Sequence, residues 1–448
     1  MRKRIQEKLG VMRADQHLGE VMKGASSSMM IQILGSILGF AVSVIIARML
    51  GAEGSGVYYL ALSVATIAAT VGRVGFDNTV VRFIASHASV QEWGAVRQVY
   101  RTAMKAVAMA SLLISIVLFS GAEWIANALF NKPYMELPLR LVSVSVLPLS
   151  FAMIQAESLR GLKNIRASQL IKNVSTSLGI LVLFYPIVSW LGAKGAVAAF
   201  VVATIATAVT AWFLWQRVWK SRSGFTVNSQ NGFSMEALFR SSWSLFWAML
   251  SGLVIMQGST IIVGIWGSAQ DVGIFNTANR VASLLIFPLV AMISILSPKF
   301  TAMHRQGDVY GLKNLARNSS AILTFYVVPA GVVAALNAER IMTVFGQDFK
   351  RGAIVLIVLL VGVVINVATG AINELLVMTG FEIDVKWVNF MGALLLVIFG
   401  PLMLFAWGVV GVAVALSMTF VFVNLAMLIL VKKRLGFWAI AMPGHKYK

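Results

Sequence analysis

Apolar runs of about twenty residues recur along the whole chain, and short polar connectors separate them. A helix of about that length crosses the hydrocarbon core of a bilayer. The pattern predicts twelve spans, which begin near Ser27, Gly56, Thr102, Pro138, Ser168, Gly195, Ser241, Gly273, Ser319, Gly352, Trp387 and Gly408. We therefore expect an all-α polytopic membrane protein with about twelve transmembrane helices.

The two halves of the chain repeat one another. The segment IIARMLGAEGSGVYYLALSV, residues 45–64, aligns with IIVGIWGSAQDVGIFNTANRV, residues 261–281, after one inserted residue. Two halves of the same orientation predict two six-helix lobes about a pseudo-two-fold axis, with a central cavity between them as the substrate path. The expected domains are an amphipathic segment 1–25, an N-lobe 26–220 (helices 1–6), a linker 221–236, a C-lobe 237–434 (helices 7–12) and a tail 435–448.

Composition excludes a water-soluble fold, and the placement of charge predicts the orientation. The chain is 58% hydrophobic with a mean hydropathy of +0.83, which is more apolar surface than one soluble core could bury. If the N-terminus is cytoplasmic, 28 of the 37 Lys and Arg residues fall on the cytoplasmic side and 7 on the outer side. This asymmetry predicts that both termini are cytoplasmic. It also explains the net charge of +20 without nucleic acid as a partner.

A polar stripe follows the second predicted span. Its members are spaced by 4, 3, 4, 3 and 4 residues, which is one face of a continuous helix: Tyr59, Ser63, Thr66, Thr70, Arg73 and Asp77. Lipid offers such groups no partners, so the stripe should face a watery space inside the bundle. Arg73 and Asp77 are one turn apart and can pair with each other, so a purely structural ion pair is the alternative.

The eighth span keeps part of this face as Asn276 and Arg280, and Arg280 has no acidic residue within one turn. Arg48 and Arg82 extend the row of cations at the two ends of the path. A guanidinium grips phosphate through paired hydrogen bonds, so the row favours a phosphate-bearing substrate. The expected substrate-binding residues are Arg48, Arg73, Asp77, Arg280, Asn276 and Arg82.

Two acidic residues, Glu157 and Glu374, occupy corresponding places near the inner ends of spans 4 and 10. They are candidates for ion coupling, and the alternative is a carboxylate paired with Arg160 or hydrogen-bonded beside Asn373. The chain has no Cys, and its four His residues lie outside the spans, so we expect no metal site in the membrane. No nucleotide-binding motif is present, and we expect no cofactor and no catalytic residue.

The run IIARMLGAEGSGVYYLALSV, followed by VVRFIA, resembles the N-terminal signature of polysaccharide flippases. These belong to the multidrug/oligosaccharidyl-lipid/polysaccharide exporter superfamily and include O-antigen and capsule unit translocases. The matching residues are Arg48, Gly51, Gly56, Tyr58 and Arg82. The resemblance implies a flippase in the inner membrane of a bacterial cell that moves a polyprenyl-pyrophosphate-linked oligosaccharide to the outer leaflet by alternating access. It also implies polysaccharide polymerase and chain-length machinery as partners.

Three other classes were weighed against this interpretation. A multidrug antiporter of the same superfamily would need acidic cavity residues for cationic drugs, whereas most candidates here are basic. A major-facilitator carrier also has six-plus-six helices, but the second connector lacks its Gly-Asp-Arg-Gly-Arg-like pattern. A membrane-embedded glycan polymerase or ligase needs a sizeable outer loop or a carboxylate cluster, and the expected outer connectors are short.

Overall fold

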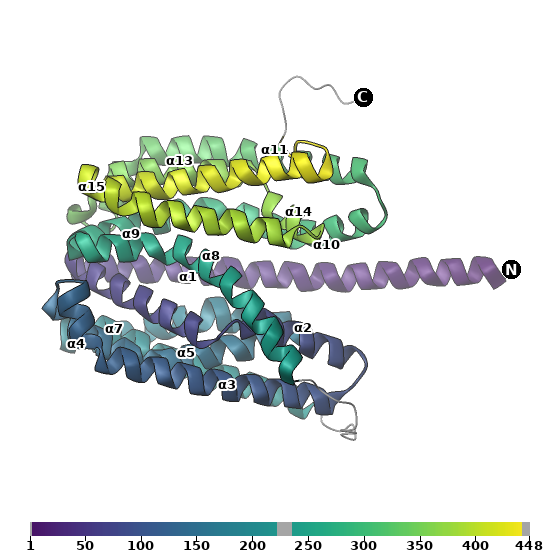
Figure 1. The fold of residues 1–448 in the computed structure, drawn as a ribbon, viewed down its shortest axis with the longest axis horizontal. Helices are drawn as coiled ribbons and strands as arrows, with labels where there is room; N and C mark the ends of the chain where they lie inside the picture. Colours follow the sequence, from purple (N-terminus) through teal and green to yellow (C-terminus); the bar gives the residue numbers. More distant parts are fainter. Residues whose placement is uncertain (1, 222–234, 441–448) are drawn as a thin grey trace.

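The computed structural model describes residues 2–221 and 235–440, and within these ranges the chain is almost entirely helical and contains no strand. Figure 1 shows the helices running roughly parallel along one direction. They are α1 (Arg2–Gly72), α2 (Phe76–Ser89), α3 (Trp93–Ser120), α4 (Ala122–Trp124), α5 (Glu136–Gly161), α6 (Ile165–Gln169), α7 (Thr176–Lys220), α8 (Met235–Trp266), α9 (Ala269–Ser283), α10 (Phe287–Arg305), α11 (Val309–Leu336), α12 (Ala338–Thr343), α13 (Gly352–Ala368), α14 (Ile372–Met378) and α15 (Glu382–Leu435).

The expected all-α polytopic fold is confirmed. In the described ranges nine helical segments are long and apolar enough to cross a membrane, and the bent pair α13–α14 makes a tenth. Two of these segments, Met29–Gly72 and Glu382–Leu435, contain 44 and 54 residues, which at about 1.5 Å per residue is twice the thickness of a bilayer core. Each departs from helical geometry near its middle, at Gly51 and at Trp407–Gly408, so each makes two crossings. The described chain therefore crosses twelve times.

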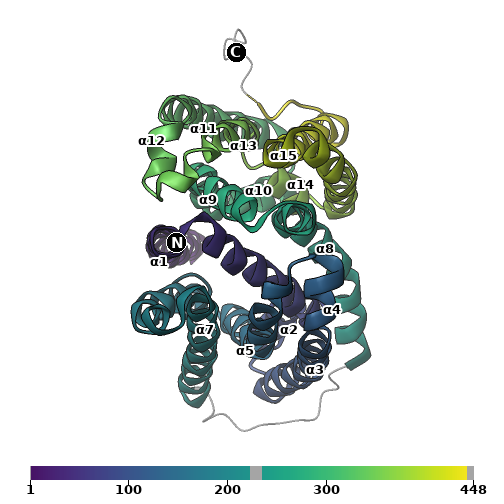
Figure 2. The same ribbon diagram turned by 90° about the vertical axis from the view of Figure 1, so that its left-hand side faces the viewer.

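Two lobes face each other across the bundle in Figure 2, with α1 to α7 in one and α9 to α15 in the other. Their helices repeat with an offset of 216 residues: α3 and α11 begin at Trp93 and Val309 and are both 28 residues long. Two turns repeat as well, because Gly192 and Gly408 both have φ near +60°, a backbone conformation that costs glycine little. The repeat seen in the sequence thus extends to element lengths and turn geometry.

The lobes share a core at one end of the bundle and separate at the other. We call the end where α1 begins and α15 ends the terminal face, and the end with the turns at Gly51, Gly192 and Gly408 the opposite face (Figure 1). One buried cluster joins both lobes through residues such as Tyr59 and Phe275, while a second cluster near the terminal face is built from α2, α3, α5 and α7. From the C-terminal half, only Leu238 of α8 enters this second cluster among the described residues.

Helix α8 crosses from one lobe to the other. Its beginning packs into the N-lobe through Leu238, and its far half packs on α15, where a side chain at Gly392 would meet Ile255.

Segment 1–25, expected to be amphipathic, is helical from Arg2 and continues into the first span, so it projects from the bundle in Figure 1. Residues 222–234 of the expected linker 221–236, and residues 441–448 of the tail 435–448, lie outside the described residues. The expected domain boundaries stay predictions.

Candidate substrate site between the lobes

The second span is not the continuous helix that the polar stripe predicted. Helix α1 ends at Gly72, α2 begins at Phe76, and the residues between include Val74 and Gly75 in the left-handed region, with φ of 48° and 76°. A side chain at Gly75 would come within 2.2 Å of the Ser242 carbonyl oxygen, so α8 packs directly on the break. Close packing of α8 therefore requires glycine at this point. Irregular backbone at membrane depth is tolerated where protein or a watery space surrounds it.

Arg73 and Asp77 bridge this break. The Arg73 Nε donates to both carboxylate oxygens of Asp77 at 2.8 and 3.0 Å, and its Nη2 donates to Thr70 Oγ1 at 3.2 Å. Arg73 follows the C-terminus of α1, and Asp77 lies in the first turn of α2. Both helix dipoles therefore favour the charge that they meet. The contacts are those of a structural ion pair, with both side chains about 90% buried.

Arg280 lies in a different environment. It comes from α9 of the C-lobe, yet its Nη1 donates to Ser43 Oγ at 2.9 Å and its guanidinium carbon lies 4.8 Å from the centre of the Tyr59 ring. Ser43 and Tyr59 both belong to α1 of the N-lobe. No carboxylate of the described residues forms an ion pair with Arg280. This cation therefore lies at the junction of the lobes with most of its five N–H donors unassigned.

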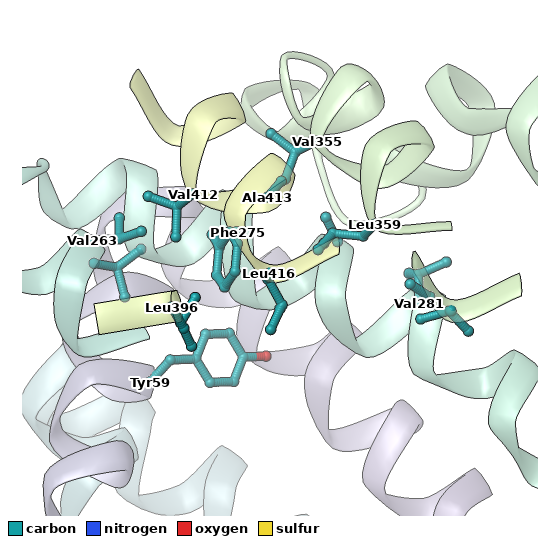
Figure 3. Packing of buried hydrophobic residues seen from close by; sticks show 14 of the residues in the cluster. Tyr59, Val263, Phe275, Val281, Val355, Leu359, Leu396, Val412, Ala413 and Leu416 are labelled. Carbon is teal, nitrogen blue, oxygen red and sulfur yellow. The ribbon is translucent and has the colours of Figure 1, made fainter. Parts of the chain in front are cut away.

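The helices that meet at this junction carry three buried hydroxyls without partners. The Tyr59 hydroxyl on α1, Ser259 on α8 and Thr277 on α9 are all buried, and none has a hydrogen-bond partner among the described residues. Figure 3 shows the Tyr59 ring of the N-lobe beside C-lobe side chains such as Phe275 and Leu416, with its hydroxyl at the edge of this apolar cluster. Burying an unpaired hydroxyl costs about 1–3 kcal/mol, so these groups favour a polar occupant near the junction.

Other polar contacts link the same helices. Ser63 on α1 donates to Gln257 Oε1 on α8 at 3.0 Å, and Thr260 on α8 donates to Asn276 Oδ1 on α9 at 3.1 Å. Asn276 also donates through Nδ2 to the Val272 carbonyl oxygen at 3.0 Å. Asn276 thus orients the α8–α9 pair, and Ser63 extends the polar lining beyond Arg280.

Helices α1 and α9 meet through a reciprocal glycine contact near the opposite face. A Cβ added at Gly56 would lie 1.7 Å from the Ala269 carbonyl oxygen, and one added at Gly273 would lie 2.0 Å from the Ala52 carbonyl oxygen. Each lobe therefore gives one Gly and one Ala in equivalent places, as a two-fold contact requires. The absence of side chains lets the two backbones touch.

Two cations of the N-lobe reinforce this joint by donating to carbonyl oxygens of the C-lobe. Arg48 of the N-lobe donates from Nε to the Val344 carbonyl oxygen at 2.9 Å, and Lys132 of the N-lobe donates from Nζ to the Gly264 carbonyl oxygen at 2.7 Å. Arg48 and Gly264 are equivalent positions of the 216-residue repeat. Burial lowers the pKa of Lys132 from its usual value, and nearby Asp271 opposes part of that effect. A cavity of about 530 Å³ beside Lys132 is lined by both lobes, including Glu53 and Gln270.

The remaining expected residues do not join Arg280. Arg48 is exposed at the opposite face, and Arg82 is exposed on α2, where its guanidinium carbon lies 5.9 Å from the Phe83 ring centre. Glu157 is buried and pairs with Arg160, at 2.9 Å, and with Lys172. Glu374 accepts a hydrogen bond from Ser297 Oγ at 2.8 Å. Both glutamates thus have the partnered environments weighed as the alternative to ion coupling.

Three features of this site were not predicted from the sequence. Tyr59 was assigned to the polar stripe but not to the binding of a cation, although aromatic faces commonly hold Arg. Lys132 is one of the seven cations predicted for the outer side, and no local pattern points to a carbonyl 132 residues away. The break at Arg73–Gly75 had a visible signal, the sequence GRVG, because two glycines flank the charge. In the described residues no group of three His, Cys, Asp or Glu side chains could hold a metal ion.

Comparisons with known proteins agree with this architecture. The sequence profile of a family described as "Polysaccharide biosynthesis protein" matches residues 21–304. A probable low-salt glycan biosynthesis flippase, Agl15 of Haloferax volcanii, is 22% identical over 87% of this chain and 78% of its own. The fold resembles an inward-facing MATE family multidrug resistance transporter of the MOP superfamily (TM-score 0.75, 16% identity, 92% of this chain and 98% of that one). It also resembles the lipid II flippase MurJ (0.72, 14%, 90% and 87%).

Proposed function

Because the chain belongs to the polysaccharide biosynthesis protein family, we propose that it is a flippase for a polyprenyl-pyrophosphate-linked oligosaccharide. It moves this lipid from the cytoplasmic to the outer leaflet of the cell membrane, with the terminal face in the cytoplasm. The predicted resemblance to polysaccharide flippases is confirmed by the family match, and a probable glycan biosynthesis flippase supports the substrate class. The chain supplies binding and a path, and no catalysis.

Arg280 carries the proposal. It is a cation without an acidic partner among the described residues, it lies where the two lobes meet, and the hydroxyl of the neighbouring Tyr59 is buried without a partner. A pyrophosphate would accept paired hydrogen bonds from the guanidinium and a further bond from Tyr59. Arg82 on α2 and Arg48 at the opposite face would contact the headgroup at the start and the end of its path. Asn276 positions α8 against α9, and the Arg73–Asp77 pair stabilises the break.

The direction of transport follows from charge. If the bound headgroup carries about two negative charges outward across an inside-negative membrane, the membrane potential favours the movement of each charge by roughly 2.3 kcal/mol per 100 mV. The membrane potential alone then favours export, so Glu157 and Glu374 need not couple an ion. Polymerase and chain-length machinery would act on the glycan after it reaches the outer leaflet.

The unpaired positive charge disfavours a multidrug antiporter, because a cationic drug would be repelled by Arg280. An embedded glycan polymerase is disfavoured because two of the acidic residues near the junction are bound to other groups: Asp77 pairs with Arg73, and Asp271 caps α9. Neither alternative accounts for a partnerless Arg between the lobes.

Reconstitution in liposomes tests the proposal. Purified protein is supplied with a labelled polyprenyl-pyrophosphate-linked glycan, and exposure of the glycan at the other leaflet is followed with a lectin. We expect exposure at unchanged product mass, its loss in Arg280→Ala, and its persistence in the control Arg305→Ala, which removes a cation from the end of α10. A change in product mass, or full activity of Arg280→Ala, would refute the proposed mechanism.

A further inference from the structure

A second candidate site lies within the N-lobe, away from the lobe junction. A cavity of about 660 Å³ is formed by α3, α5 and α7, and its lining includes Tyr100, Arg101, Lys105, Gln155 and Trp212. Trp212 is 47% exposed, whereas Gln155 is 2% exposed, so α5 forms the floor of a groove that opens sideways between α3 and α7. Nothing in the proposed transport path uses these residues.

The position of the groove sets what can reach it. Arg101 and Lys105 lie in the first half of α3, which begins at Trp93 near the terminal face, and Trp212 lies near the corresponding end of α7. In a bilayer this is the level where the headgroups of one leaflet meet the acyl chains. Trp and Tyr favour that level because their rings are amphipathic. Met104, Phe151 and Val209 supply an apolar wall beside the cations, as an acyl chain attached to a headgroup requires.

The polar groups of the groove are unsatisfied. Arg101 and Lys105 are one turn apart and exposed, and neither pairs with a carboxylate in the described part of the chain. Gln155 donates from Nε2 to the Tyr100 hydroxyl at 3.3 Å, and its own Oε1 is buried without a partner. The Tyr100 hydroxyl can then donate its proton outward, while Gln155 Oε1 can accept one. A buried acceptor without a partner is costly, and a ligand hydroxyl would satisfy it.

The walls of the groove are held together by an aromatic stack between α3 and α7. The Tyr100 ring stacks on Trp215 with 4.1 Å between ring centres, and Trp215 is 97% buried and stacks in turn on Trp219. This aromatic stack fixes the Tyr100 hydroxyl at the mouth of the cavity. The groove is therefore formed before any ligand binds, which lowers the entropic cost of binding.

We propose that this groove binds the headgroup of an anionic glycerophospholipid from the surrounding leaflet. Arg101 and Lys105 bind its phosphate, Tyr100 donates to a phosphate oxygen, and a glycerol hydroxyl donates to Gln155. A lipid with a glycerol headgroup and one negative charge, such as phosphatidylglycerol, matches this combination of donors and acceptors. The bound lipid holds α3 against α7 and so stabilises the N-lobe.

Native mass spectrometry of the full chain in detergent tests this inference. Phosphatidylglycerol and phosphatidylcholine are titrated separately onto the wild-type protein, the Arg101→Gln/Lys105→Gln variant and a matched control, Lys432→Gln/Lys433→Gln. The control removes two exposed cations from the end of α15. We expect phosphatidylglycerol to bind wild type and control alike, and at least about tenfold more weakly to the groove variant, since each cation near the headgroups adds about 1 kcal/mol.

Two further measurements test the role of the headgroup hydroxyls and the identity of the bound lipid. Gln155→Leu keeps both cations, and we expect it to reduce the preference for phosphatidylglycerol over phosphatidic acid, which lacks the glycerol hydroxyls. Equal binding of phosphatidylglycerol and phosphatidylcholine by wild type would overturn the proposal, and so would unchanged binding by the groove variant. Stronger binding of polyprenyl phosphate than of phosphatidylglycerol, abolished by the same variant, would show that the groove takes the transported lipid instead. These results do not depend on Arg280 or on transport, so the two proposals can fail separately.

Discussion

The two central arginines lie in corresponding spans of the two lobes but in contrasting environments. Arg73 sits in a helix break, where Asp77 neutralises it and two helix ends favour both charges. Arg280 sits within α9, where Ser43 and Tyr59 of the other lobe contact it without neutralising it. A cation that has its own anion stabilises the structure, and one that lacks an anion is available to a ligand. For this reason the proposed function places the substrate phosphate at Arg280 and not at Arg73.

The largest expected effect separates these two roles. Arg280→Ala should lower the rate of glycan exposure by two to three orders of magnitude, because losing a charged hydrogen-bond partner of the phosphate costs about 2–5 kcal/mol. Arg280→Lys should retain part of the rate, since it keeps the charge but not the paired donors. Liposome transport measures both. A wild-type rate of glycan exposure in Arg280→Ala would show that Arg280, like Arg73, does not bind the substrate.

Arg73 should affect stability more than recognition. Arg73→Ala leaves Asp77 buried without a partner, and we expect a loss of about 3 kcal/mol in resistance to unfolding. The double variant Arg73→Ala/Asp77→Ala should recover most of it. Thermal melting in detergent provides the measurement, and transport by the double variant provides the decisive control. If the double variant is stable but inactive, Arg73 also contacts substrate.

Unlike the two arginines, the two glycines of the lobe contact should give equal effects when each is replaced. Gly56→Ala and Gly273→Ala each push a methyl group into a backbone carbonyl, so both should disfavour the joined opposite face by about 2 kcal/mol. Because the chain has no Cys, spin labels at Glu123→Cys and Gln347→Cys would report the separation of the lobes at that face. Gly258→Ala is the control, because its Cβ meets only ordinary contacts at 3.5 Å. Unequal shifts would argue against the two-fold joint.

Glu157 and Glu374 occupy nearly corresponding places in the two halves but differ in their partners. Glu157→Gln strands Arg160 and Lys172 beside a neutral amide, whereas Glu374→Gln can keep its hydrogen bond from Ser297. We expect a stability loss of about 1–2 kcal/mol for the first variant and less for the second. Melting temperatures measure this difference. A transport defect in Glu374→Gln at unchanged stability would instead favour ion coupling.

Lys132 should give the smallest effect, visible through pH. Its pKa is lowered by burial, so the folded protein holds this proton less tightly than the unfolded chain does. The cost of burying the cation is fully present at neutral pH and diminishes as the pH rises through the lowered pKa towards the usual 10.5. The melting temperature of wild type relative to Lys132→Met should therefore rise as the pH is raised from neutrality towards 10.5. A flat difference over that range would mean that Lys132 is not buried as the cation.

Periodicity was sufficient to predict the twelve crossings, since hydrophobic length alone determines them. The repeat between residues 45–64 and 261–281 predicted the two lobes, because it is visible in the sequence itself. Periodicity could not predict the break at Arg73–Gly75, because the spacing of polar residues fits a continuous helix equally well. Nor could it separate Arg73 from Arg280, since the partners Ser43 and Tyr59 approach Arg280 from more than 200 residues away. Long-range contacts of that kind follow from packing, which one sequence does not display.

The touching backbones of Gly56 and Gly273 have a consequence for how often the molecule can cycle. Two helices that seal through leucines would bury a large apolar area and adhere strongly, so reopening would be slow. At the glycine contact the Cα hydrogens lie against carbonyl oxygens, an interaction worth only about 0.5–1 kcal/mol per contact. In the proposed transport cycle this contact therefore adds close fit to the joint but little resistance to separation of the lobes.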